Sequence, residues 1–548
     1  MKKKQAITGA AISFLISIPW IAVSYAGQQI SQLPQIPIDL FEWITRAMSG
    51  SVVTAGLEVM IQALQALQIG SLSSMGKALE FVMAYFLALL ALTILGVIYG
   101  ITIHNLRITW YARGFIAGII LWLLTIPLGA WGGWGGVTFG AGILWLMGIS
   151  LVWGLVLAWG VGTNLRLLAE EDNAGRRRTL VQIVVGALAL SGLSILLPGW
   201  LTASSGQKER AIEVEVGTPE PTTPPPTPPP TEAGFTPVPG TRPGITPIKD
   251  FYRVDINLNP PGQEEFQRET DRLAQRLRAQ GETGISKETY LLVVDGLVEK
   301  PLALDLNALK AFPVVDQYAT LECISNPIAG DLVSTTIFQG ARLKDVLSRA
   351  GLMSKAIDIR FTCIDGYTES LPIDSATDPR TLLCYSMGNQ PLTSKHGAPL
   401  RLYTPDRFGM KNPKWIIKIE AISQDYFGYW EQRGWSEQAL VKTASVIDTV
   451  RTLKDGNIEA GGMAFAGARG IQKVELRVEE GDWSAAELDR PLSPLTWVLW
   501  RAAFRMSSGQ HRLTVRAVDG TGEIQTPNKE STYPDGATGY HSLSVDIK

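Results

Sequence analysis

The chain has 548 residues, and its formal net charge at pH 7 is −2, because 49 basic residues nearly balance 51 acidic ones. This length predicts two or three folded units, and the charge balance argues against a nucleic-acid partner. The three cysteines (Cys323, Cys363 and Cys384) are too few for a disulfide scaffold or for a metal site built from paired cysteines.

Residues 1–205 are strongly apolar and predict a membrane domain with about five spanning helices. A span needs about 20 mostly apolar residues, and the candidate segments are 7–26, 79–103, 112–130, 139–163 and 180–200. The first follows three lysines and reads as a retained anchor or as a signal peptide; the lack of a clean small-residue cleavage site favours the anchor. Residues 51–70, interrupted by Glu and Gln, predict an amphipathic helix at the surface or against the bundle.

Basic residues in short loops predict the orientation of the spans. Lys2–Lys4, Arg107 and Arg176–Arg178 place the N-terminus and two loops in the cytoplasm, whereas the loop at 131–138 has no charge. Five crossings then put the rest of the chain outside, on an integral cell membrane protein. Arg176–Arg178 either form part of a twin-arginine export signal or simply obey the positive-inside rule.

Residues 206–248 predict a proline-rich linker, because they contain PEPTTPPPTPPP and VPGTRPGITP. The linker reads as a stalk between the membrane and a globular part, or as a ligand for a proline-reading module. From residue 249 to 430, short strands, Gly/Pro turns and short helices predict an α+β domain. Within it, Tyr290–Gly296 predicts a strand, and Asp305–Phe312 and Leu343–Leu352 predict helices.

Cys323 lies in TLECISN (320–326), after a strand-like run and before a turn. A lone cysteine is most often a small core residue, but a thiolate at a strand end is a soft ligand for a transition metal. Three segments downstream extend the pattern: DPRTLLCYSMGNQPL (378–392), HGAPLRL (396–402) and GMKNPKW (409–415). In order and spacing, these segments resemble the sulfite oxidase-type molybdopterin-dependent oxidoreductases, over about residues 250–548.

The resemblance implies a molybdenum–molybdopterin cofactor whose metal is bound by Cys323. It also implies that Tyr367 is a catalytic residue near the metal, where its phenol binds an oxo group or a substrate oxygen; an ordinary half-buried tyrosine is the alternative. The cofactor phosphate needs fixed cationic donors, for which a solvated basic face is the competing interpretation. The expected cofactor-binding residues are Tyr252, Arg253, Cys323, His396, Arg401, Lys411, Asn412 and Lys414.

One departure from the family bears on the substrate. In sulfite oxidases an arginine a few residues after the cysteine binds sulfite, but residues 324–330 contain no basic residue. A sulfoxide reductase of the same cofactor class and a non-enzymatic, membrane-tethered binding module therefore remain alternatives. His104 is the only histidine before residue 396, so a bis-histidine haem is not expected in the bundle, and electrons are expected to pass through a separate partner.

Residues 431–548 predict an all-β, immunoglobulin-like sandwich of short strands and turns. Apolar residues alternate on two strands: Val474, Leu476 and Val478 on the first, and Leu513, Val515 and Ala517 on the second. The resemblance implies that this domain packs on the cofactor domain and forms a homodimer. The expected fold is an α-helical membrane bundle followed by an α+β sulfite oxidase-like molybdopterin domain and this sandwich. The expected function is oxygen-atom transfer to or from a small-molecule substrate by a membrane-anchored enzyme.

Overall fold

The computed structural model describes residues 2–31, 33–48, 56, 59, 72–131, 139–205, 235–257, 260–279, 290–453 and 457–547. The amphipathic segment expected at 51–70 falls almost wholly outside them, as do the loop at 132–138 and residues 206–234 of the expected linker. The chain divides into two compact units, an N-terminal unit (1–48 and 77–210) and a C-terminal unit (49–76 and 211–548).

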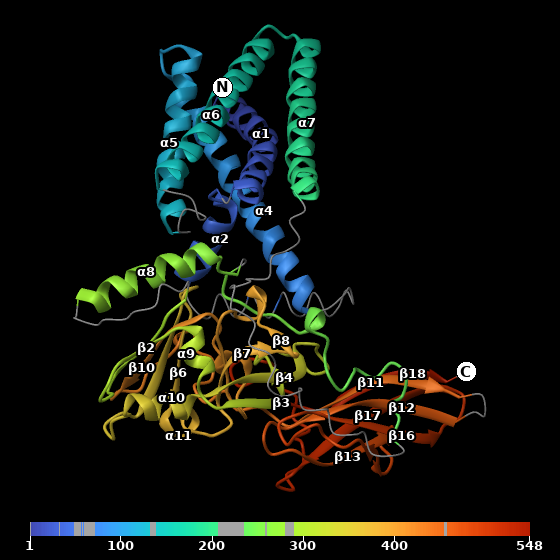
Figure 1. The fold of residues 1–548 in the computed structure, drawn as a ribbon. Helices are drawn as coiled ribbons and strands as arrows, with labels where there is room; N and C mark the ends of the chain where they lie inside the picture. Colours follow the sequence, from blue (N-terminus) through green and yellow to red (C-terminus); the bar gives the residue numbers. More distant parts are fainter. Residues whose placement is uncertain are drawn as a thin grey trace. The chain divides into compact units, whose positions relative to one another are not determined.

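The N-terminal unit consists of long apolar helices (Figure 1). They are α1 (Lys2–Ser31), α2 (Ile36–Ala47), α4 (Leu72–Ile101), α5 (Trp110–Trp131), α6 (Phe139–Ala169) and α7 (Asn173–Ser205), with a short 3-10 turn η1 (Ile103–Asn105). Among the described residues, four helical segments are long and apolar enough to cross a membrane: Lys2–Ser31, Ala78–Asn105, Trp110–Ala130 and Phe139–Ala169. These four helices suggest a membrane anchor.

The segment expected as a fifth span lies in α7, which is a continuous helix but is not one of these four. The number of crossings therefore stays a prediction, and so does the orientation that depends on it.

Small residues let two helices of this unit approach closely. A Cβ added to Gly154 of α6 would lie 2.4 Å from the carbonyl oxygen of Gly114 and 2.4 Å from the amide nitrogen of Gly118, both on α5. Only glycine leaves room for this contact, and such small-residue interfaces are a common way for helices to associate in a bilayer.

The first part of the C-terminal unit is built on two sheets. In one sheet the order is β2 (Leu302–Leu304), β1 (Leu292–Gly296), β10 (Ile416–Ile422), β5 (Asp358–Cys363) and β6 (Thr368–Pro372). Strands β1 and β10 are parallel, and the other neighbours in this sheet are antiparallel. The second sheet has the order β3 (Val314–Glu322), β4 (Val333–Arg342), β7 (Leu382–Met387) and β8 (Gln390–Pro391), and β9 (Arg401–Tyr403) also pairs with β7.

Helices and 3-10 turns connect these strands. They are α8 (Gln263–Ala279), α9 (Leu306–Lys310), α10 (Leu343–Ala350), α11 (Ile373–Ala376), η3 (Ile248–Asp250), η4 (Ser394–His396), η5 (Gly409–Lys411) and η6 (Glu431–Arg433). The strand expected at 290–296 and the helices expected at 305–312 and 343–352 are present as β1, α9 and α10. Asp305 caps α9 by accepting a hydrogen bond from the Ala308 amide at 2.7 Å.

The second part of the C-terminal unit is a pair of four-stranded sheets. One has the order β11 (Ala444–Thr452), β12 (Asn457–Phe465), β16 (Val498–Arg505) and β15 (Glu487–Leu488). The other has the order β14 (Ser484–Ala485), β13 (Ile471–Val478), β17 (Gly509–Asp519) and β18 (His541–Ile547). Buried side chains from both sheets form one apolar cluster. In this cluster Trp500 of β16 packs with the alternating apolar residues of β13 and β17, which are Val474, Leu476, Leu513, Val515 and Ala517. The two sheets therefore share a core, and their assignment as immunoglobulin-like remains a prediction.

The end of the expected linker is part of the folded C-terminal unit. Phe235 and Val238 are buried, and Phe235 belongs to an apolar cluster that includes Trp497. Arg242 forms an ion pair with Asp448 of β11, with 2.7 Å between Nη2 and Oδ1. Residues 235–248 are thus held by side-chain contacts, which their Gly/Pro-rich composition did not predict.

Candidate active site

Cys323 lies where β3 ends and the loop to β4 begins, as expected from its sequence context. Its amide donates to the Leu332 carbonyl at 2.9 Å, and its carbonyl accepts from the Asn326 amide at 2.9 Å. The Asn326 side chain holds the loop closed by accepting from the Leu332 amide at 3.0 Å. The thiol is buried, and its Sγ lies 3.1 Å from Ser325 Oγ. Burial raises the pKa of the Cys323 thiol against the opposing effect of Ser325, so a cation is needed to hold it as a thiolate.

Tyr252 reaches the same place from the start of the domain. A Cβ added to Gly409 of η5 would lie 2.5 Å from Tyr252 Oη and 3.7 Å from Cys323 Cα. The Tyr252 ring stacks on Phe251, with 5.6 Å between their centroids. The structure therefore brings Tyr252, Cys323 and Gly409 together, although they are far apart in the sequence.

Arg401 is a buried cation that has no carboxylate partner among the described residues. Arg401 is 4% exposed, and its Nη1 donates to the His396 carbonyl at 3.2 Å. Its Nε is buried without a hydrogen-bond partner, and Arg401 forms no ion pair within the described part of the chain. Burial lowers the pKa of Arg401, with smaller opposing effects from Cys384 and Tyr252. A buried guanidinium with an unsatisfied donor fits an anionic ligand.

Two further bases lie beside Arg401. Lys414 forms an isolated β-bridge with Arg401, and its amino group pairs with the fully buried carboxylate of Asp255. Arg253 pairs with the same carboxylate through Nε. One carboxylate thus contacts two bases next to Arg401.

His396 completes this group as a neutral ring. Burial and the neighbouring Arg401 lower the pKa of His396 to about 4, so it is uncharged at neutral pH. Its Nε2 lies 3.3 Å from the Ile248 carbonyl, and its ring packs edge-on against Phe251. Five of the expected cofactor-binding residues are therefore neighbours and are called the anchor cluster here: Tyr252, Arg253, His396, Arg401 and Lys414.

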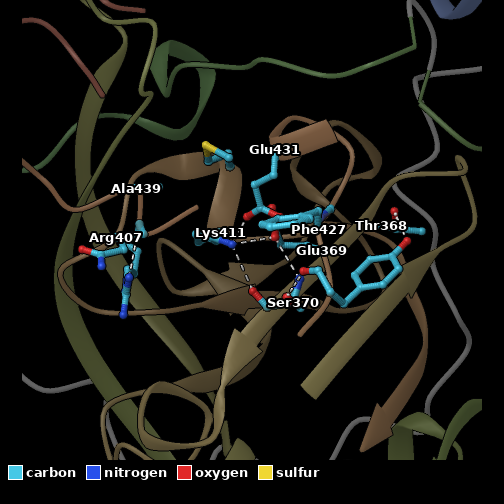
Figure 2. Close-up of polar contacts among 12 residues, drawn as sticks. Thr368, Glu369, Ser370, Arg407, Lys411, Phe427, Glu431 and Ala439 are labelled. Carbon is cyan, nitrogen blue, oxygen red and sulfur yellow. Dashed lines mark hydrogen bonds and ion pairs between the residues drawn. The ribbon is translucent and has the colours of Figure 1, made fainter. Parts of the chain in front are cut away.

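Lys411 lies elsewhere, between two carboxylates (Figure 2). Its Nζ donates to Glu369 Oε1 at 2.9 Å and to the Ser370 carbonyl at 3.3 Å, and it also pairs with Glu431. The side chains of Lys411, Glu369 and Glu431 are 3%, 0% and 1% exposed. We call these three residues the ion triad. In it Lys411, one of the expected cofactor-binding residues, is already paired with two carboxylates of the protein.

Tyr367 and Asn412 also make contacts within the protein. The Tyr367 hydroxyl hydrogen-bonds the Met410 carbonyl at 2.7 Å and Glu369 Oε2 at 3.1 Å, which places it against the ion triad. The side-chain Oδ1 of Asn412 accepts from the Thr404 backbone amide at 2.7 Å, and its Nδ2 donates to the Phe408 carbonyl at 3.0 Å. Asn412, one of the expected cofactor-binding residues, therefore fixes its own loop.

The 3-10 turn η5 connects the two groups of residues. Gly409 touches Tyr252 and the backbone of Cys323, the Met410 carbonyl accepts from Tyr367, and Lys411 is the centre of the ion triad. Sequence reasoning named Lys411 and Tyr367 but missed their carboxylate partners. Glu369 follows Tyr367 by two positions, and residues two apart in a strand point to the same face. This spacing was the one signal in the sequence that the two side chains lie together.

The residues present fit a molybdopterin. No set of three or more His, Cys, Asp or Glu among the described residues forms a metal site, so a metal bound by Cys323 would take most of its ligands from a cofactor. The dithiolene of a pterin supplies such ligands, and the anchor cluster offers cationic and neutral groups for its phosphate and ring. Of these, the unsatisfied Arg401 is the clearest match.

Comparisons with known proteins show which proteins this chain is similar to. Residues 280–430 match the protein family described as "Oxidoreductase molybdopterin binding domain". The chain is 28% identical to human mitochondrial sulfite oxidase over 294 residues, which are 44% of this chain and 54% of that protein. It is 31% identical to the Uncharacterized oxidoreductase YuiH of Bacillus subtilis (strain 168) over 144 residues, which are 26% of this chain and 71% of that protein.

The chain spans about half the length of the mitochondrial sulfite oxidases that it matches. Among solved structures, the sulfane dehydrogenase SoxCD from Paracoccus pantotrophus is similar, with 21% identity and a TM-score of 0.43. That similarity covers 48% of this chain and 77% of that one.

Proposed function

Because the chain belongs to the sulfite oxidase-type family of molybdopterin-dependent oxidoreductases, we propose that it transfers an oxygen atom between water and a small substrate. Family membership makes it an enzyme whose cofactor is molybdenum–molybdopterin, which sets aside the alternative of a non-enzymatic binding module. The cofactor supplies the oxygen-transfer and redox chemistry, and the protein binds it, orients it and excludes competing reactions.

The observation that carries the proposal is the buried and unpaired charge of Arg401. Burying a cation is costly unless an anion accompanies it, and no protein carboxylate pairs with this one among the described residues. A cofactor phosphate would supply that anion, and Lys414, Arg253 and the neutral His396 would complete the site. Cys323 would bind the metal through its thiolate.

The proposed position of the enzyme is supported by its apolar helices and basic loops. The four apolar helices suggest a membrane anchor, and the basic residues around Arg107 and Arg176–Arg178 favour the cytoplasmic side for their loops. With α7 as a fifth span in the lipid bilayer, the catalytic domain lies outside the cytoplasm. Electrons then pass through a separate partner, and the C-terminal sandwich is the proposed contact in a homodimer.

The substrate is an oxyanion or a sulfoxide, and the loop after Cys323 bears on this choice. Residues 324–330 contain no basic residue, which removes one cation that would attract sulfite. Oxidation of sulfite takes oxygen from water and releases two protons and two electrons, whereas reduction of a sulfoxide consumes two of each and releases water. A neutral sulfoxide does not need such a cation, so a sulfoxide is the second candidate substrate.

A substrate panel on the full chain in detergent tests this choice. Sulfite is offered with ferricyanide as electron acceptor, and methionine sulfoxide is offered with a reduced viologen dye as donor. Activity with one pair that is lost in Cys323→Ser identifies the direction of the reaction. Activity that survives in Cys323→Ser would overturn the assignment of Cys323 as the metal ligand.

A further inference from the structure

The ion triad has more negative than positive charge if every member is ionised. Lys411 carries one positive charge, and Glu369 and Glu431 together carry two negative ones. Because all three side chains are at most 3% exposed, a net negative charge there would be poorly solvated. Uptake of one proton by a carboxylate makes the triad neutral, which burial strongly favours.

The hydrogen bonds indicate which oxygen takes this proton. Both oxygens of Glu431 accept N–H hydrogen bonds, one from Lys411 and one from the Gly428 amide. Glu369 Oε1 accepts from Lys411 at 2.9 Å and from the Ser370 amide at 2.8 Å. Glu369 Oε2 lies 3.1 Å from the Tyr367 hydroxyl, and the carboxyl groups of Glu369 and Glu431 are also within hydrogen-bonding reach of each other. A proton on Oε2 is therefore compatible with every other contact.

The Tyr367 hydroxyl needs such a proton to satisfy both of its neighbours. It has one proton to donate, and the Met410 carbonyl at 2.7 Å can only accept. The longer contact with Glu369 Oε2 becomes a hydrogen bond when Glu369 donates to the phenol oxygen. If Glu369 is ionised, the carboxylate competes with the Met410 carbonyl for the single phenol proton.

We propose that Glu369 and Glu431 share one proton around Lys411 and that Glu369 is a positioning residue for Tyr367. When Glu369 is protonated, it holds the Tyr367 hydroxyl on the Met410 carbonyl; when it is ionised, it draws that hydroxyl away. Met410 belongs to η5, whose Gly409 touches Tyr252 and Cys323. The charge of the triad therefore acts on the loop beside the metal ligand. The relevance to turnover rests on the proposed function, whereas the proton count does not.

The groups around the triad strengthen the case for a proton. Burial, opposed by Lys411 and reinforced by Glu431, raises the pKa of Glu369 to about 8. Asp358 and the Cys363 thiol approach from β5, and Asp425 and Glu437 approach from the loops on either side of η6. All four add negative charge or none. Of the basic residues on these elements, Arg360 of β5 pairs with Glu420 at 3.8 Å and Arg433 of η6 lies over the Tyr429 ring, and among the described contacts neither pairs with a triad carboxylate.

Infrared spectra of the full chain in detergent, recorded against pH, test the proposal. The carbonyl band of a protonated buried carboxyl should disappear as the pH passes through about 8 in the wild type. Glu369→Gln should abolish this band, and Glu431→Gln should abolish it too, because Lys411 and Glu369 then balance without a proton. Glu487→Gln, at an exposed carboxyl paired with Arg501, is the matched control and should keep it.

The two variants should move Tyr367 in opposite directions, which a merely structural role would not do. The Tyr367 phenol band, assigned with Tyr367→Phe, should stay in its low-pH position at every pH in Glu369→Gln. In Glu431→Gln it should stay in its high-pH position. The buried carboxyl of Glu322, whose pKa is raised by burial to about 7, gives a band of its own, which is assigned with Glu322→Gln and subtracted. Any other titrating carboxyl band that survives in either variant, or a phenol band that moves the same way in both, would overturn the proposal.

Glu369→Gln and Glu431→Gln each test the proposal without the other variant and without the cofactor. If Glu369→Gln does not fold, Glu431→Gln still decides the proton count and the direction of the phenol band. The molybdenum content of each sample is measured alongside. Chains without molybdenum would count against the proposed function, while the carboxyl titration would still decide whether the triad holds a proton.

Discussion

Replacing Arg401 by methionine should stabilise the cofactor-free chain while weakening cofactor binding. Arg401 is 4% exposed, makes one hydrogen bond to the protein and has an unsatisfied Nε. Desolvation of a buried charge costs several kcal/mol, and replacing buried ionic groups by apolar ones can stabilise a protein by about 1–4 kcal/mol. The lost contact with the Phe338 ring, 5.6 Å from the guanidinium carbon, offsets about 0.5–2 kcal/mol. A net gain of about 0.5–2 kcal/mol therefore remains.

Thermal unfolding of the full chain in detergent measures this gain. For a unit of this size, about 1 kcal/mol raises the midpoint by about 2–4 °C, so cofactor-free Arg401→Met should melt several degrees higher than cofactor-free wild type. Hydrogen bonds to a charged group contribute about 1.5–3 kcal/mol, so the same variant should hold its cofactor about 10- to 100-fold more weakly.

Arg242→Met is the matched control, because Arg242 has a carboxylate partner. Loss of the Arg242 guanidinium leaves the Asp448 carboxylate, which is 9% exposed, without its ion-pair partner. This variant should therefore melt at a lower temperature and keep its molybdenum. If cofactor-free Arg401→Met is destabilised as Arg242→Met is, or if it retains molybdenum fully, Arg401 is a structural residue and the reasoning is refuted.

Three further predictions concern the thiol, the ion triad and the membrane topology. Cys323→Ser should fold with a midpoint close to that of the wild type but lose the metal–thiolate absorption bands; unchanged bands would exclude Cys323 as the ligand. The pKa of Glu369 is raised by folding, so its stabilising effect is complete below the unfolded value and is lost as pH rises to about 8. Relative to Glu369→Gln, the wild-type free energy of unfolding should therefore fall by up to about 1.4 kcal/mol per pH unit in that window, and a pH-independent difference would contradict it. The three native cysteines are buried, so an impermeant maleimide should label Glu487→Cys in intact cells and Arg177→Cys only after permeabilisation; the reverse pattern would invert the topology.

Much of the architecture could be predicted because it depends on local patterns. Apolar runs of sufficient length indicated the four helices that suggest a membrane anchor, and alternating residues such as Leu513 and Val515 indicated a strand with one buried face. The position of Cys323 at a strand end also followed from its neighbours. These features are set by periodicity, which a sequence shows directly.

The side-chain partners could not be predicted, because they are brought together by the tertiary fold. Lys411, Arg401 and Lys414 look alike in the sequence as basic residues near Gly and Pro. In the structure Lys411 is bound by Glu369 and Glu431, Lys414 shares Asp255 with Arg253, and Arg401 has no ion-pair partner among the described residues. The distinction depends on elements that are far apart in the chain, such as the strand β6 and the 3-10 turn η5, and no local pattern records it.

This chain should bind one molybdenum–molybdopterin through Cys323 and the anchor cluster. Metal and pterin analysis of the full chain, purified in detergent from cells that synthesise the cofactor, tests this binding. We expect about one molybdenum per chain and release of a pterin on denaturation. A folded chain that contains neither would contradict it.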